Sequence, residues 1–157
     1  MTIRVGIGID AHALERGVPL VLGGVRFDYD RGLAGHSDGD VLAHALVDAV
    51  LGAAGLGDIG TLFPSDDARY HGASSLDLLR EAYRRVEDAG WKLVNADCIL
   101  VGEQPRIAAH RDEMRRRLSE AVGGAEVNVR ATTTDHLGFT GRGEGLAAQA
   151  VALLEQP

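Results

Sequence analysis

The residues best suited to chemistry stand at the end of the first apolar run and in the segment that follows it. Asp10 and His12 are two positions apart, and His44 closes the segment 36–44 further along the chain. One carboxylate and two imidazoles suit zinc, and three protein ligands leave a fourth position for a substrate oxygen. If the chain reverses between them, these side chains form an open zinc site, although their chemistry also suits another divalent metal such as manganese or cobalt.

The periodicity of the apolar residues indicates how these side chains are held. Apolar residues alternate with glycine or polar residues from Ile3 to Ile9, which predicts a strand with one packed face. Asp10 and His12 then project from the face opposite Ile9. Around His44, apolar residues recur at three- and four-residue steps, which predicts a helix. Either element alone is more often a capping feature or a partly buried histidine, so the metal site depends on both.

The predicted helix also carries a stripe of Asp40, His44 and Asp48 at four-residue spacing. A histidine that binds a metal through one ring nitrogen usually donates the other N–H to a carboxylate or a carbonyl. We therefore expect a carboxylate of this stripe to orient the His44 ring.

The rest of the chain predicts short strands and helices. We expect a hairpin of residues 20–22 and 25–27, strands near 93–101 and 127–131, and helices near 74–90, 105–122 and 143–154. In the first of these helices Ser74 and Asp77 form a capping-box pattern. This succession predicts an α/β (α+β) fold in one domain, residues 1–157, with a mixed sheet, helices packed on one side and a small N-terminal hairpin.

Composition restricts the class of protein. The chain has 157 residues, 45% of them hydrophobic, which fits one domain with its own core. The single Cys98 allows no internal disulfide and reads as a core residue. A formal charge of −7 argues against nucleic-acid binding, so a polyanionic substrate needs local cations. We see no leader and no apolar stretch that spans a membrane, and expect a cytoplasmic protein.

A second polar block covers residues 132–145. It follows a predicted strand and offers Thr132, Thr133, Thr134, Asp135 and Arg142, followed by glycines. Hydroxyls and exposed backbone N–H groups suit oxyanions, although the block taken alone slightly favours a glycine-rich turn with a threonine cluster that ends a strand. The carboxylate-bearing loops 58–60 and 63–67 suit ribose hydroxyls or a second cation, or are simply solvated.

Together these motifs resemble the 2-C-methyl-D-erythritol 2,4-cyclodiphosphate synthase family of the non-mevalonate isoprenoid pathway. The resemblance covers essentially the whole chain: Asp10 and His12, the segment 36–44, Gly57 to Gly60, Leu62 to Pro64, and residues 132–145. It implies a cyclising, CMP-releasing lyase in which a 2-phosphate attacks the β-phosphorus of a cytidine diphosphate. By this resemblance, Asp10, His12 and His44 hold zinc, Asp135 holds a second ion (Mg²⁺ or Mn²⁺) that bridges the diphosphate, and Thr133 acts beside it.

The resemblance also implies the substrate-binding residues and the assembly. His36, Ser37 and part of loop 63–67 would contact the methylerythritol phosphate. The ribose would lie at residues 58–60, the base in loop 102–108 and the diphosphate at residues 132–134. The substrate-binding residues implied in these segments are Asp58, Ile59, Gly60, Phe63, Asp67, Gly102, Pro105, Arg106, Ile107, Ala108, Thr132, Thr133, Thr134 and Asp135. The family forms homotrimers with active sites between subunits. Phe139, Arg142 and Glu144 match a central cavity that takes an isoprenoid diphosphate in some members, or serve trimer packing.

Some positions depart from the family pattern. Asp135 replaces a glutamate, Glu103 and Arg106 replace glutamine and lysine, Ser65 and Asp66 alter a common loop sequence, and His71 replaces a lysine. These changes affect substrate contacts and the second metal, not the zinc ligands. Two rival functions stay open: a metal-dependent phosphohydrolase that uses a metal-bound water, and a non-enzymatic trimer that binds nucleotides or isoprenoid diphosphates.

Overall fold

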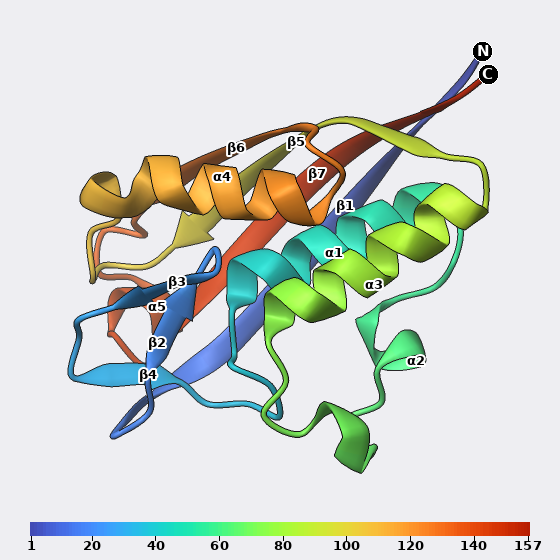
Figure 1. Cartoon of the computed structure of the whole chain (residues 1–157). Coiled ribbons are helices and arrows are strands. Elements are labelled where there is room, and N and C mark those ends of the chain that lie inside the picture. The colour runs from blue at the N-terminus through green and yellow to red at the C-terminus, as the bar shows by residue number, and fades with distance from the viewer.

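The computed structural model describes all residues from 1 to 157 and contains a five-stranded mixed sheet (Figure 1). The strand order is β4-β1-β7-β5-β6, with bounds β1 (Thr2–Arg16), β4 (Arg31–Leu33), β5 (Lys92–Val101), β6 (Glu126–Thr132) and β7 (Gly145–Gln156). β5 and β6 are parallel, and the other pairs are antiparallel. A separate hairpin, β2 (Leu20–Leu22) with β3 (Val25–Phe27), matches its predicted bounds.

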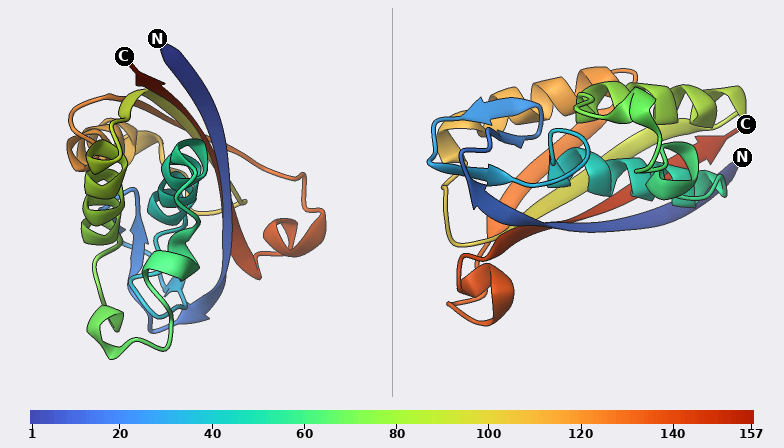
Figure 2. Two further views of the ribbon diagram at one scale, coloured as in Figure 1. Left: turned by 90° about the vertical axis from the view of Figure 1, so that its right-hand side faces the viewer. Right: turned by 90° about the horizontal axis from the view of Figure 1, so that it is seen from below.

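The long helices cover one face of the sheet, as predicted. Figure 2 shows α1 (Val41–Ala54), α3 (Ser75–Asp88) and α4 (Arg111–Ala121) on this side, whereas the short α5 (Gly138–Gly141) lies on the other. The remaining short helices are α2 (Ile59–Leu62), η1 (Ala68–Tyr70) and η2 (Ala108–His110). None of the helices has the length and apolar character needed to cross a bilayer.

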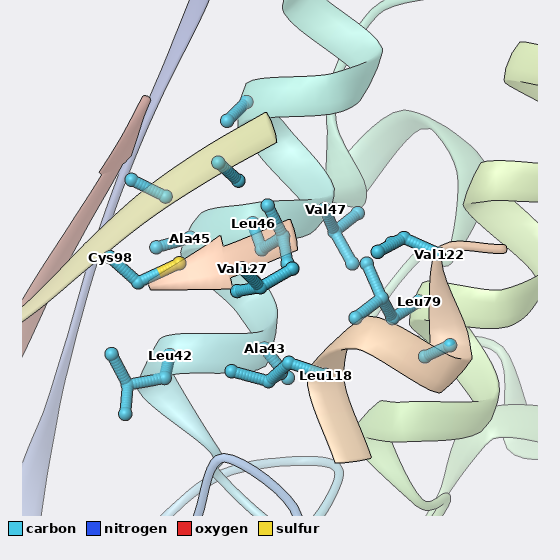
Figure 3. Packing of buried hydrophobic residues seen from close by; sticks show 14 of the residues in the cluster. Leu42, Ala43, Ala45, Leu46, Val47, Leu79, Cys98, Leu118, Val122 and Val127 are labelled. Carbon is cyan, nitrogen blue, oxygen red and sulfur yellow. The ribbon is translucent and has the colours of Figure 1, made fainter. Parts of the chain in front are cut away.

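The core lies between the sheet and the long helices. Forty buried residues form one cluster, and α1 contributes eleven of them, including Leu42, Leu46 and Val47 (Figure 3). Cys98 is fully buried in this cluster, and burial raises the pKa of its thiol to about 12, so it is the core residue that we expected. Ser74 is the N-cap of α3, but its side chain makes no capping hydrogen bond, so the predicted capping box does not form.

The packed face of β1 is not the one that the sequence pattern suggests. Ile3, Val5, Ile7 and Ile9 are 60 to 69% exposed, whereas Gly6 and Gly8 face α1. A Cβ at Gly8 would collide with the backbone carbonyl of Ala45, so only glycine allows the helix to lie this close. The branched side chains consequently occupy the outer face of the sheet. Asp10 and His12 do lie opposite Ile9, on the side that faces α1.

The predicted C-terminal helix is wrong. Residues from Gly145 to Gln156 form β7, a central strand paired with β1 and β5 on its two edges. Its alanines and leucines fit both periods, and pairing on both edges overrides the local helix preference. The third predicted helix also begins later than Pro105: residues 102–107 form a loop, η2 follows, and α4 starts at Arg111.

Candidate metal centre and substrate pocket

The structure brings the carboxylate of Asp10 between the imidazoles of His12 and His44. Asp10 Oδ2 lies 3.0 Å from His12 Nδ1 and 3.1 Å from His44 Nδ1. The potential ligand atoms of the three residues all lie within 4.8 Å of one another. Because Asp10 and His12 come from β1 and His44 from α1, the close contact between this strand and this helix sets the geometry of the centre.

The environment of these side chains fits a divalent cation. His12 Nδ1 is buried and makes no hydrogen bond, although an Asp10 oxygen lies near it. Buried polar atoms normally have a partner, and a metal ion shared by three donors would supply one. Burial by itself would raise the pKa of Asp10, but the neighbouring imidazoles of His12 and His44 together outweigh burial and lower this pKa. An anionic carboxylate beside two imidazoles is the donor set that zinc prefers.

The carboxylates on the His44 stripe have other partners, which corrects the expected orienting contact. Asp40 is the N-cap of α1 and accepts hydrogen bonds from the backbone N–H groups of Gly23 (2.9 Å), Gly24 (2.7 Å) and Ala43 (3.1 Å). Asp48 accepts one from the N–H of Ile59 at 2.7 Å. Both residues anchor neighbouring loops to α1 and do not contact the imidazole.

Two serine hydroxyls contact the second nitrogen of His44 instead. Ser75 Oγ lies 2.8 Å and Ser37 Oγ 3.0 Å from His44 Nε2. The negative charges nearby also act on the ring. Burial favours a lower pKa for His44, but Asp10, Asp40 and Asp38 together raise this pKa overall. Ser75 lies far from the metal motifs in the sequence, and no spacing rule connects it with His44.

A pocket of about 590 Å³ opens beside the metal centre. Five residues predicted to contact substrate line it together with the three metal-ligand candidates: His36, Ser37, Ile59, Gly60 and Phe63. The sequence motifs do not include Tyr70 and Leu78, which also line it. Their approach depends on how loop 63–74 returns to α3, so a local pattern could not reveal it.

Two carboxylates that we predicted to contact the substrate instead bind groups in their own loops. Asp58 is the N-cap of α2, and its Oδ1 accepts hydrogen bonds from the N–H and the hydroxyl of Thr61, both at 2.8 Å. Asp67 forms an ion pair with Arg69 at 2.7 Å. Neither residue lines the pocket, whereas the neighbouring Ser65 and Asp66 do.

A second pocket of about 260 Å³ contains the predicted base-binding loop. It is lined by Gly102, Pro105, Arg106, Ile107, Ala108, Thr132 and Thr133, all predicted to contact substrate, and by Glu103, Ala131 and Arg111. Arg111 was missed because it reads as an ordinary polar residue of a helix. The loop from β5 and the end of β6 therefore meet as the resemblance implies.

The two pockets are separated within one chain. His12 on β1 pairs with Leu146 on β7, and Thr132 on β6 pairs with Val101 on β5. From β1 to β6 there are three strand steps, which at about 4.8 Å each amount to about 14 Å. Thr133 and Asp135 thus lie apart from the metal centre of their own chain.

The remaining predicted residues lie beyond β6. The Thr134 hydroxyl donates to the Leu137 carbonyl at 2.6 Å, so it serves the loop itself. Phe139 is 43% exposed, and Arg142 pairs with Glu144 at 3.2 Å. Phe139 belongs to α5 and Arg142 follows it directly, and this helix lies on the face of the sheet away from the long helices (Figure 2).

This fold and site define a protein with a mixed sheet, a layer of helices on one face, and three side chains placed to hold a divalent metal at the edge of a pocket. The model of the YgbB family matches residues 3–155, and the chain belongs to this family. Curated relatives agree. A Moorella thermoacetica protein is 58% identical over 97% of this chain and 94% of its own, and one from Rubrobacter xylanophilus is 57% identical over 98% and 95%. Both are named 2-C-methyl-D-erythritol 2,4-cyclodiphosphate synthase.

Solved structures give the same result. The bifunctional IspDF of Campylobacter jejuni is 41% identical with a TM-score of 0.94 and aligns with 99% of this chain, which spans 43% of that longer protein. A 2C-methyl-D-erythritol-2,4-cyclodiphosphate synthase in its CDP-bound form is 40% identical with a TM-score of 0.88, over 97% of this chain and all of its own. The family that the sequence resembles is therefore confirmed.

Proposed function

We propose that this protein converts 4-diphosphocytidyl-2-C-methyl-D-erythritol 2-phosphate into 2-C-methyl-D-erythritol 2,4-cyclodiphosphate and CMP, for isoprenoid precursor biosynthesis. A 2-phosphate oxygen attacks the β-phosphorus and forms a new P–O bond, while the bond from this phosphorus to the bridging oxygen breaks and CMP leaves. The observation that carries the proposal is the centre of Asp10, His12 and His44, which opens into a pocket in a chain whose curated relatives bear this synthase name.

The chemistry requires positioning and charge neutralisation more than a base, because the attacking phosphate is already anionic at neutral pH. Asp10, His12 and His44 would hold Zn²⁺ or another divalent metal, and Asp135 would hold Mg²⁺ or Mn²⁺. Such ions polarise phosphoryl oxygens and neutralise developing negative charge. Within the pocket beside the centre, His36 and Ser37 would orient the methylerythritol phosphate.

The second pocket suits the nucleotide. Loop 102–108 would enclose the base mainly through backbone groups, while Thr132 and Thr133 would contact the diphosphate. Asp58 directs one carboxylate oxygen to Thr61, which leaves Oδ2 for a ribose hydroxyl. Structures of relatives with CDP support a nucleotide ligand of this size.

The proposed assembly is a homotrimer whose active sites lie between subunits. One substrate molecule has to reach both pockets, and the separation of about 14 Å within a chain favours a site completed by a neighbouring copy. The exposed face of Ile3, Val5, Ile7 and Ile9 offers apolar surface for such packing. We further propose that residues 1–157 act as one catalytic domain in the cytoplasm, which the single core and the buried thiol of Cys98 support.

Phosphorus NMR of the purified protein with the cytidylyl methylerythritol 2-phosphate substrate, zinc and magnesium tests the function. We expect signals of the cyclic diphosphate and of CMP. Inorganic phosphate would identify a phosphohydrolase instead, and unchanged substrate with a fully metallated protein would identify a binding protein. Either result contradicts the proposal.

His44→Ala tests the metal centre. Because His44 supplies a ligand from α1, the variant should bind less zinc per subunit and lose cyclisation by roughly 100- to 1000-fold. Metal analysis, activity and circular dichroism measure this. His71→Ala is a matched control for zinc binding, since His71 packs edge-on against His36 but lies outside the ligand cluster. Full activity in His44→Ala would remove this residue from the mechanism.

A further inference from the structure

Ser75, the first residue of α3, is a fully buried polar residue in contact with the metal centre. Its Oγ lies 2.8 Å from His44 Nε2 and forms a short hydrogen bond with a carboxylate oxygen of Asp38. The Ser37 hydroxyl lies 3.2 Å from Ser75 Oγ and 3.0 Å from the same ring nitrogen. These groups link α3, loop 36–40 and α1 behind the imidazole.

The direction of the hydrogen bonds follows from a count of protons. An ionised Asp38 carboxylate can only accept, so the single hydroxyl proton of Ser75 must be donated to it. Ser75 Oγ then has lone pairs left, with which it accepts from His44 Nε2–H. In a neutral imidazole a proton on Nε2 leaves the lone pair on Nδ1. That nitrogen is the one that faces Asp10 at 3.1 Å.

Asp38 is itself held in place by the backbone. Its Oδ1 accepts from the N–H of Asp40 at 3.1 Å, and its Oδ2 accepts from the N–H of Ser75 at 3.1 Å. The carboxylate thus bridges the loop before α1 and the first turn of α3. This fixes the acceptor end of the chain of hydrogen bonds and, through Ser75, the plane of the His44 ring.

We propose that Ser75 is a positioning residue which, with Asp38, keeps the His44 proton on Nε2 and directs the Nδ1 lone pair at the metal. The carboxylate that orients this ligand therefore comes from loop 36–40 through a hydroxyl of α3, and not from the stripe on α1. The inference rests on the proposed metal role of His44 but not on the identity of the substrate.

The first test is the zinc affinity of the full chain, measured by competition with a chromophoric chelator. Since partners of metal-bound histidines commonly contribute 10- to 100-fold to affinity, we expect a loss of about this size in Ser75→Ala and in Asp38→Asn. Ser75→Thr keeps the hydroxyl and should retain most of the affinity. Ser74→Ala is the matched control, because Ser74 is exposed, precedes Ser75 directly and makes no side-chain capping bond.

The second test reads the ring directly, by ¹⁵N NMR of the histidines in zinc-loaded protein, because without a metal the Asp10 carboxylate, 3.1 Å from Nδ1, competes for the ring proton. We expect a His44 Nε2–H that exchanges slowly with water in the native chain and in Ser74→Ala, and a rapidly exchanging one in Ser75→Ala. This measurement remains decisive even if the protein turned out to have another substrate, and it detects a variant that fails to fold.

The activity assay separates positioning from a general structural role. In Ser75→Ala, cyclisation should return largely when zinc is raised to saturate the weakened site, because the residue acts through the ligand. Native zinc affinity and an unchanged exchange rate of the His44 Nε2–H in Ser75→Ala would overturn the inference. An equal loss of affinity in Ser74→Ala would also overturn it, since the effect would then belong to the start of α3.

Discussion

Gly8 on β1 lies directly beneath the carbonyl of Ala45 on α1, where this helix packs closely on the sheet. A Cβ at Gly8 would overlap this oxygen and lie 2.8 Å from Ala49 N. Asp10 follows Gly8 on the same face of the strand, and His44 precedes Ala45 on the helix. The missing side chain at Gly8 therefore sets the distance between the metal ligands of the strand and that of the helix.

Gly8→Ala should lower both stability and metal affinity. The methyl group has to push α1 away from β1, which costs about 1–3 kcal/mol of the free energy of unfolding and displaces His44 from Asp10. Urea denaturation and zinc competition measure the two effects. Gly52→Ala is the control, because Gly52 is exposed on the same helix and its nearest neighbour, the Ile7 carbonyl, lies 3.9 Å from an added Cβ. Native zinc affinity in Gly8→Ala would contradict the argument.

Asp40 should make stability depend on pH. Burial raises the pKa of this carboxyl from 3.8 to about 6, against the hydrogen bonds from Gly24, Gly23 and Ala43. Because the pKa of Asp40 is higher in the folded than in the unfolded state, Asp40 contributes fully to the free energy of unfolding below pH 4. This contribution is lost as the pH rises through 6. A difference of about two pKa units corresponds to about 3 kcal/mol.

Asp40→Asn isolates this contribution, since the amide does not titrate. We expect the native chain to exceed the variant in free energy of unfolding most strongly near pH 4, and by about 3 kcal/mol less at pH 7. Urea titrations of both chains at several pH values provide the comparison. A difference that stays constant or widens toward pH 7 would show that Asp40 is ionised in the folded protein throughout.

Glu103 should hold the proposed phosphate-binding loop in its active shape. Its carboxylate accepts hydrogen bonds from the N–H groups of Thr134 at 3.3 Å and His136 at 3.2 Å. In this turn, Asp135 and His136 adopt left-handed backbone conformations with φ of 51° and 66°, which are less favourable for them than for glycine. The two hydrogen bonds stabilise this turn, and the turn positions Thr133 and Asp135.

In Glu103→Ala we expect kcat/KM to fall by roughly 10- to 100-fold, because a small displacement of the loop misplaces the diphosphate. Zinc binding should not change, since Asp10, His12 and His44 lie on other strands and helices. Steady-state kinetics and metal analysis check this result. Glu126→Ala serves as control, because Glu126 is an exposed glutamate at the other end of β6. Equal kinetics in the two variants would exclude the positioning role.

The sequence predicts those parts of the structure in which local patterns agree with the tertiary contacts. The hairpin and the strand β5 appear where their patterns indicate, and so does α3. The prediction fails at β7, where Ala148, Ala150 and Ala152 are buried because β1 and β5 pair on both sides. Alanine has a high helix propensity, so the local pattern could not reveal this pairing.

The same limit applies to the candidate site. Asp10, His12 and His44 could be found because each stands in a short motif whose period reveals its element. The orientation of β1 could not be predicted, because the larger apolar residues of a strand normally mark its packed face. In β1 the glycines lie on the packed face instead. Ser75 could not be found either, because it reaches His44 only through the packing of α3 on α1.

Asp135→Ala should separate the two proposed metal sites. Asp135 lies in the loop after β6, outside the cluster that contains His44, so zinc should remain bound while the magnesium dependence of the reaction changes. Asp135→Glu restores a carboxylate one methylene longer and should recover magnesium-dependent activity. Metal analysis and magnesium titrations of the rate distinguish the variants. Loss of zinc in Asp135→Ala would mean that Asp135 belongs to the zinc site and that the two metal sites have been assigned the wrong way round.

Ile7→Asp should break the proposed trimer without disturbing the metal centre of the single chain. Ile7 is 62% exposed on the outer face of β1, whereas Asp10 and His12 face α1 on the other side. A charge among Ile3, Val5 and Ile9 would be costly only if a second copy buries it. Analytical ultracentrifugation should therefore show smaller species that still bind zinc.

Activity then tests whether the site lies between subunits. If the nucleotide pocket at Thr132 of one copy completes the metal pocket of another, Ile7→Asp loses cyclisation together with the trimer. Glu87→Lys alters charge on the exposed surface of α3, away from this face, and should leave both assembly and rate unchanged. A monomer with native activity would require one chain to bridge the distance of about 14 Å between its own pockets.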